Sequence, residues 1–132
     1  MASLTPVIMD YIKRPDTNKV MSTVNEDGCA HSIVLGSVLV PDQETIAIGR
    51  VWVKTTGKNL NRDPRAEFLF FSGKTAYSVV CDLVESSSEG PMIEQINQYL
   101  SRMRMSTASV WLFKVKAVFD EGISENTGSQ II

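Results

Sequence analysis

Two threonines, two lysines and an asparagine lie close together in one short polar stretch, residues 54–59. Apolar, strand-like runs flank this stretch on both sides, at residues 45–52 and 66–71. The stretch is long enough for roughly one or two helical turns, and the hydroxyl of Thr55 or Thr56 can cap such a helix. The other amides of the first turn carry the positive end of the helix dipole. Together with the ammonium groups of Lys54 and Lys58, they favour a phosphate.

The same residues are also typical of a solvated polar turn whose lysines contact only water. Spacing alone does not distinguish this turn from a phosphate site, so both interpretations stand at this point. The difference between them depends on how the neighbouring elements position the stretch.

Side chains that could catalyse a reaction are sparse elsewhere in the chain. His31 is the single histidine, and it lies in a predicted strand with no orienting carboxylate nearby in sequence, which disfavours a serine or cysteine triad. No Cys-x-x-Cys motif is present, so no metal centre is predicted. The sequence Gly57-Lys58-Asn59 lacks the upstream glycine and the hydroxyl of a phosphate loop. If the protein is an enzyme, we therefore expect an organic cofactor to carry the reaction.

The composition is that of a folded, soluble protein. Of the 132 residues, 43% are hydrophobic and 21% are charged, which predicts one domain over residues 1–132 with a sizeable core. The formal net charge of -2 disfavours nucleic acid as a partner, and the apolar runs are too short to span a membrane. The N-terminus does not resemble a secretory signal, so we expect a cytoplasmic protein. Cys29 and Cys81 are then expected to be reduced, small core residues.

A β-rich order of elements surrounds the polar stretch. Thr5-Pro6 predicts the start of a short helix, and residues 86–89 predict the cap of a longer helix with apolar positions up to Met103. Asp27-Gly28 predicts a tight hairpin turn. Strands are predicted at residues 19–25, 29–40, 45–49, 65–71, 76–84 and 109–118. Gly36 interrupts the second strand, which indicates a bulge or a close approach to the backbone.

These elements predict a mainly β fold, with roughly six antiparallel strands and two outer helices. A small barrel is favoured over a flat sheet, because a flat sheet would expose two strand edges. The strand at residues 65–71 is apolar on both faces, so we expect the barrel to cover one face and a second subunit the other. Residues 119–132 are expected to form a loose tail or an arm that reaches the other chain of a dimer.

The order of elements resembles the FMN-binding split-barrel family. The residues that carry the resemblance are Lys54-Thr55, Asn59-Leu60 and Asp63-Pro64, which precede an apolar strand. This family includes pyridoxamine 5'-phosphate oxidase and small dimeric FMN-binding proteins, and the likeness to the small proteins is greater. The resemblance covers residues 8–118. It implies a six-stranded antiparallel split barrel that binds FMN without a covalent bond at the interface of a homodimer.

In that family a Lys/Arg-Thr/Ser pair followed by Asn-Leu holds the FMN phosphate. The resemblance therefore implies a phosphate site formed by Lys54, Thr55 and Asn59, with Lys58 as a further contact. Three residues separate Thr55 from Asn59, whereas the family usually has two at this place. Either the loop carries one extra residue, or Thr56 takes the hydroxyl position and Lys54 reaches in from farther back.

The resemblance also implies where the flavin ring lies, namely against the long second strand and the strand before the polar stretch. By position these residues are Val34, Leu35, Gly36 and Ser37, with Ala47, Ile48, Gly49 and Arg50 behind them. Gly36 and Gly49 would let the ring approach backbone amides closely. Trp111 and Tyr99 are candidate contacts from the second subunit, although packing in the core or the interface explains each of them as well.

The function implied by the resemblance is that of an FMN flavoprotein, a small oxidoreductase or an electron-transfer protein with a small-molecule or protein redox partner. One alternative is a non-catalytic flavin-binding, storage or sensor protein. Another is a pyridoxamine 5'-phosphate oxidase-like oxidase of a small organic substrate, although the C-terminus lacks the arginine-bearing signature of that enzyme. A split barrel with a different cofactor, a deazaflavin or a haem ligated by His31, is a further alternative.

Overall fold

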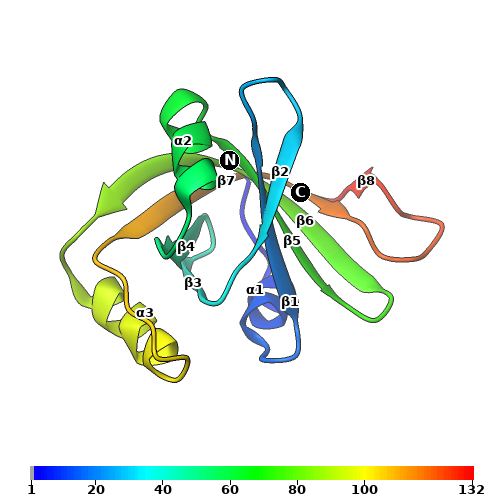
Figure 1. Ribbon diagram of the computed structural model, residues 1–132. Coiled ribbons are helices and arrows are strands. Elements are labelled where there is room, and N and C mark those ends of the chain that lie inside the picture. Colours follow the sequence, from blue (N-terminus) through cyan, green and yellow to red (C-terminus); the bar gives the residue numbers. More distant parts are fainter. Residues whose placement is uncertain (1) are drawn as a thin grey trace.

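The computed structural model describes residues 2–132, which form three helices and eight strands (Figure 1). The helices are α1 (Pro6–Lys13), α2 (Lys54–Arg62) and α3 (Pro91–Ser101). The strands are β1 (Asn18–Val24), β2 (Ala30–Val34), β3 (Val38–Asp42), β4 (Thr45–Gly49), β5 (Arg65–Ser72), β6 (Thr75–Ser87), β7 (Val110–Asp120) and β8 (Ser129–Gln130). The prediction of a mainly β, antiparallel fold is confirmed, but the expected numbers of six strands and two outer helices were too low.

Helix α1 begins where the sequence predicts. The hydroxyl of Thr5 accepts a hydrogen bond from the amide of Ile8 at 3.3 Å, and Pro6 occupies the first turn, where a missing amide costs nothing. The helix buries Ile8, Tyr11 and Ile12 on one face. This face closes one side of the core.

The sheet has the strand order β2-β1-β5-β6-β7-β4-β3, with β8 paired to the outer part of β7. All pairings are antiparallel, and three of them, β1–β2, β3–β4 and β5–β6, join strands that are connected by short turns. Within residues 2–132 no pairing joins β2 to β3, so the strongly curved sheet does not close into a complete barrel. The opening lies between these two edge strands.

The strand predicted at residues 29–40 is divided into two. Strand β2 pairs with β1 and ends at Val34, whereas β3 begins at Val38 and pairs with β4. Residues 35–37 connect them across the opening of the sheet. Gly36 lies in this crossing, so the break that it indicated in the sequence is where the chain changes from one edge of the sheet to the other.

Two other boundaries differ from the sequence-based expectation. Strand β6 continues to Ser87, and α3 follows a left-handed Gly90 (φ 106°) with no side-chain cap, so the serines at 86–88 end a strand instead of capping a helix. The expected tail at 119–132 folds back on its own chain. The amide of Gly128 donates to the carbonyl of Asp120 at 2.8 Å, and the amide of Ile131 donates to Val118 at 2.8 Å.

The core lies in the concave side of the sheet and is centred on three fully buried rings, those of Phe68, Phe70 and Phe113. Phe68 and Phe113 pack edge to face with ring centroids 5.1 Å apart, the arrangement that the quadrupoles of aromatic rings prefer. Cys81 is buried as expected, but Cys29 is exposed beside the β1–β2 turn, and neither forms a disulfide. Among the described residues no helix has the length and apolar character needed to cross a membrane.

Candidate functional site

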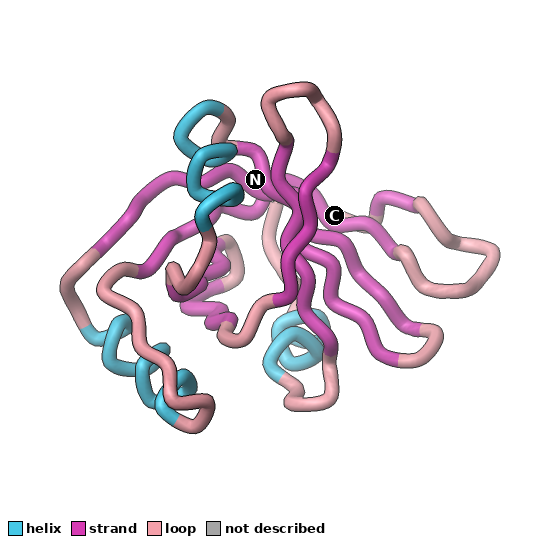
Figure 2. The backbone as a smooth tube through the Cα atoms, in the orientation of Figure 1, coloured by secondary structure: helices cyan, strands magenta, loops and turns pink. Residues whose placement is uncertain are grey.

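Helix α2 contains the polar stretch, and it lies beside the β1–β2 hairpin (Figure 2). The helix begins at Lys54 after Val53, and no side chain caps it. The prediction that Thr55 or Thr56 caps the helix is therefore wrong, because both threonines already lie in its first turn. The first intrahelical bond runs from the amide of Gly57 to the carbonyl of Val53 at 2.7 Å. The amides of residues 54–56 have no acceptor within the described chain, as helix geometry dictates for an uncapped N-terminus.

These free amides lie at a pocket of about 240 Å³ between α2 and strand β2. One wall is made by His31 and Ile33, and the other by residues 52–56. Trp52 adopts a left-handed backbone conformation (φ 51°), which turns the chain sharply between β4 and α2. Its indole is 86% exposed at the edge of the pocket. The positive end of the α2 dipole therefore lies at a small pocket and not at a flat surface.

Three cations surround the first turns of α2, namely Arg50, Lys54 and Lys58. None of them forms a salt bridge with an acidic residue of the described chain. The guanidinium of Arg50 lies over the ring of Trp111, 5.1 Å from its centroid, a cation–π contact. A guanidinium nitrogen also lies 3.2 Å from where a Cβ on Gly57 would be, so Gly57 permits this close approach. Arg50 thus lies against the helix backbone.

The backbone of Arg50 is fixed by the segment that precedes β7. Its amide donates to the carbonyl of Ser109 at 3.1 Å, and its carbonyl accepts from the hydroxyl of Thr107 at 2.8 Å. Asn97 of α3 holds Thr107 through both backbone groups, at 2.8 and 3.1 Å. Helix α3 therefore supports the position of Arg50.

The side chain of Asn59 anchors α2 and does not face solvent. It is only 3% exposed, and its amide nitrogen donates to the hydroxyl of Thr23 at 3.0 Å and to Oδ1 of Asn25 at 2.9 Å. Arg62, one turn later, donates to the carbonyl of Val24. The structure therefore places Asn59 as the residue that holds the helix on the β1–β2 hairpin, behind the free amides.

The structure disperses the residues predicted to face the flavin ring. Ala47 and Ile48 are completely buried in the core, so their side chains face no pocket. A Cβ on Gly49 would lie 2.8 Å from Ile96, because α3 packs directly on this glycine. Trp111 is buried beneath Arg50, as expected for core packing. Both faces of β4 are covered, since Ile48 belongs to the main core and Ala47 to the cluster that α3 forms with the sheet.

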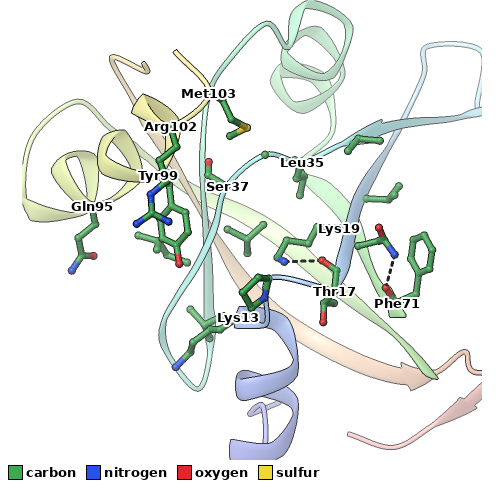
Figure 3. Close-up of a pocket in the computed structure, with 18 of the residues that line it drawn as sticks. Lys13, Thr17, Lys19, Leu35, Ser37, Phe71, Gln95, Tyr99, Arg102 and Met103 are labelled. Carbon is green, nitrogen blue, oxygen red and sulfur yellow. Dashed lines mark hydrogen bonds between the residues drawn. The ribbon is translucent and has the colours of Figure 1, made fainter. Parts of the chain in front are cut away.

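Val34, Leu35, Gly36 and Ser37 belong instead to a second and larger concavity, of about 1050 Å³ (Figure 3). We call this concavity the α1–α3 cleft, because residues around the ends of helices α1 and α3 form its two sides. Tyr99 lines it from α3, together with Arg102 and Met103. A Cβ on Gly36 would lie 3.1 Å from the methyl group of Met103, so this side chain covers the glycine.

No sequence pattern predicted the charged members of this cleft, Lys13, Lys19 and Arg102. They come from α1, β1 and the end of α3, and no motif connects them. The one local signal is that Lys19 stands among the β-forming residues of a strand, where a lysine is unusual. That signal indicates neither a cleft nor the partners of the ammonium group.

No family model matches the sequence. No curated protein sequence matches it either.

Solved structures, in contrast, match over most of the chain. HupZ of Group A Streptococcus has a TM-score of 0.76 at 19% identity, over 95% of this chain and 99% of that one. An FMN-binding protein from Syntrophomonas wolfei gives 0.75 at 15% identity, over 90% and 89% of the two chains. A candidate pyridoxamine 5'-phosphate oxidase from Lactobacillus delbrueckii gives 0.72 at 18% identity, over 90% and 95%. At these identities the matches show the fold, which is the predicted split-barrel fold of FMN-binding proteins.

The role of Asn59 as an anchor makes a testable prediction. Asn59→Ala removes two hydrogen bonds and leaves the buried hydroxyl of Thr23 without this partner, so the free energy of unfolding should fall by about 1–3 kcal/mol. Urea unfolding followed by circular dichroism measures the change. Asn61→Ala, at an exposed position of the same helix, is the matched control and should stay within about 0.5 kcal/mol of wild type. Equal losses for both variants would contradict the anchoring role.

Proposed function

We propose that the chain binds FMN without a covalent bond, with the phosphate at the N-terminus of α2. The observation that carries this proposal is that the free amides of residues 54–56 lie at a pocket beside Arg50 and Lys54. A dianion at this place satisfies the amides and meets the positive end of the helix dipole. The split-barrel fold, shared with an FMN-binding protein, supports this choice of ligand.

The burial of the two threonines supports one of the two phosphate arrangements left open by the sequence. Both threonines line the pocket, but Thr55 is exposed whereas Thr56 is only 1% exposed. We therefore assign the phosphate contact to the hydroxyl and amide of Thr55, next to Lys54. Asn59 then acts from behind, through the hydrogen bonds that hold the helix in place. Lys58, one turn after Lys54 on the same face of the helix, adds positive charge.

The remainder of the flavin needs more room than the α2 pocket offers. At about 240 Å³ this pocket is smaller than the ~300–1,000 Å³ of sites that enclose a whole small molecule. One large apolar side chain stands uncovered at the edge of this pocket, that of Trp52 with 86% exposure. We propose that a second copy of the chain packs over Trp52 and completes the ring site, which makes the protein a homodimer.

We assign the side chains of the site to binding and orienting a cofactor. His31 at the pocket wall is the only histidine of the chain. When FMN is bound, its isoalloxazine would supply one- and two-electron chemistry. We therefore propose a small oxidoreductase or electron-transfer protein. Flavin storage or sensing is the first alternative. A pyridoxamine 5'-phosphate oxidase-like activity is the second alternative and has less support.

The phosphate assignment predicts a difference between FMN and riboflavin, which lacks the phosphate. Lys54→Ala should weaken FMN binding about tenfold, the effect of one charge-assisted hydrogen bond, and should leave riboflavin binding nearly unchanged. Quenching of flavin fluorescence on titration measures both dissociation constants.

Lys74→Ala is the control, because Lys74 is also exposed but lies in the β5–β6 turn, far from α2 (Figure 1). This variant should bind both flavins as wild type does. A wild-type protein that takes up no FMN would reject the proposal, and an equal loss of both flavins in Lys54→Ala would reject the phosphate assignment.

The homodimer predicts a mass of two chains that depends on the face around Trp52. Trp52→Glu places a charge where the second copy should pack, so sedimentation should give the mass of a single chain. The matched control is Ile123→Glu, at another apolar residue with 75% exposure in the loop between β7 and β8. This variant should keep the mass of two chains. A monomeric wild type, or a dimeric Trp52→Glu variant, would argue against this interface.

Reduction kinetics distinguish an oxidoreductase from a storage protein. For an oxidoreductase or electron-transfer protein, the FMN-loaded protein should be reduced by NADH or NADPH faster than free FMN at the same concentration, and reoxidised when an acceptor is added. Loss of absorbance in the flavin bands, recorded without oxygen in a stopped-flow instrument, measures the rate. Reduction slower than that of free FMN with every donor tried would favour storage or sensing.

A further inference from the structure

The charged residues that line the α1–α3 cleft are all positive, although the chain as a whole is slightly acidic. The protein has a net charge of -2, yet Lys13, Lys19 and Arg102 line the cleft and none of the described lining residues is acidic. Figure 3 shows these three side chains on different sides of the space, with Lys19 at its floor. A concave, low-dielectric wall of one sign of charge concentrates the field and attracts ligands of the opposite sign.

Lys19 is held in place without a counter-ion. Its ammonium group donates to the carbonyls of Thr17 at 2.8 Å and Arg14 at 3.2 Å, which leaves one of its three donors free. Burial lowers the pKa of Lys19, and the attraction of Asp16 offsets this only in part. An ammonium group that is partly desolvated and lacks a carboxylate partner is a costly feature, and it is typical of sites that receive an anion.

The nearest carboxylate, that of Asp16, is already used. Arg14 binds it with two parallel hydrogen bonds, at 3.1 Å from Nε and 2.7 Å from a terminal nitrogen. Such a bidentate pair engages both carboxylate oxygens of Asp16 on Arg14. Asp16 is consequently not among the residues that line it.

Arg102 ends helix α3 through its backbone amide, so its side chain is not needed there. The carbonyl of Leu100 in the last turn accepts from the amides of Met103 and Met105, both at 2.9 Å, so backbone groups satisfy it. The guanidinium instead lies 5.9 Å from the ring centroid of Tyr99 at the side of the cleft. Its donors therefore remain free for a ligand.

Apolar side chains make up most of the remaining wall. Three of them, Val34, Tyr99 and Met103, are among the large hydrophobic residues that stay exposed in this chain. A site with apolar walls and a few convergent polar groups is typical of small-molecule pockets, and about 1050 Å³ is enough for an aromatic body with an acidic group.

We propose that the α1–α3 cleft is a binding site for a small organic anion, a carboxylate or phosphate ester with an aromatic or apolar body. Lys19 and Arg102 hold the acidic group, and Tyr99 and Met103 contact the body. This inference does not depend on the FMN proposal, since the residues of the α2 pocket do not line the cleft. If the α2 pocket binds FMN, the protein would have two ligands, FMN at α2 and the organic anion in the α1–α3 cleft.

Three related probes test the site by isothermal titration calorimetry. Naphthoate carries a carboxylate, naphthyl phosphate carries a phosphate, and naphthamide is the neutral control with the same ring. We expect one anion per chain, bound at least about tenfold more tightly than naphthamide, because charge-assisted bonds to two cations are lost with the amide. The tighter of the two anions identifies the acidic group that the site prefers.

Lys19→Met and Arg102→Gln remove one cation each with little change in shape. Each should weaken the preferred anion about fivefold to tenfold and leave naphthamide unchanged. Lys74→Met, outside the cleft, should bind as wild type. Arg102 is exposed, so its variant should fold even if Lys19→Met is destabilised by the loss of its two carbonyl contacts.

Several outcomes would overturn the proposal. Equal affinity for the amide and both anions, or unchanged affinity in both cleft variants, would show that the cations do not bind the ligand. Competition of the anion with saturating FMN would place the flavin itself in the cleft. A lower oligomeric mass for the two cleft variants would make the cleft an interface between copies. Unchanged anion binding at saturating FMN, with unchanged mass, supports a separate site.

Discussion

The amide group of Asn59 is the interaction on which the α2 site depends. Both of its N–H groups are used on the β1–β2 hairpin, on Thr23 and Asn25, and Arg62 reaches the same hairpin one turn later. The second half of the helix is therefore fixed, and its first turn projects forward without a cap. A helix whose N-terminus were capped by its own threonine would have one fewer amide to offer a ligand.

The incomplete closure of the sheet explains why the concave sites lie where they do. Strands β2 and β3 are its two edges, and the chain crosses between them through residues 35–37. One side of this crossing region leads to α2 and the pocket at His31, and the other leads to the space between α1 and α3. A fully closed barrel would pair β2 with β3 and remove the opening that residues 35–37 cross.

The sequence predicted the elements well, because each carries a local signal. Strand β4 has the predicted limits, Asp27-Gly28 forms the first turn, and Thr5 caps α1, all from patterns within a few residues. The predicted start of α2 was wrong. Local rules favour Thr55 over Val53 as the cap, because a threonine hydroxyl can accept a hydrogen bond from a free amide. Here the sharp turn at Trp52 and the anchor at Asn59 decide the boundary, and both depend on contacts with distant strands.

The site was predictable only where its residues are neighbours in sequence. Lys54, Thr55 and Lys58 meet around α2 because a helix brings them there. The structure separates the residues expected around the flavin ring, because α3 packs directly on Gly49 and Ala47, and this helix lies far along the chain from β4. For the same reason no sequence pattern joins Lys19 to Arg102, which line one cleft only after the sheet has formed.

The backbone at Trp52 carries one more implication. A left-handed conformation costs a residue with a Cβ about 1 kcal/mol or more, and glycine would adopt it freely. An indole that projects into water does nothing inside its own chain to offset this cost. The proposed packing of a second copy over Trp52 would supply a benefit outside the isolated fold, and position 52 would then be where folding and recognition favour different amino acids.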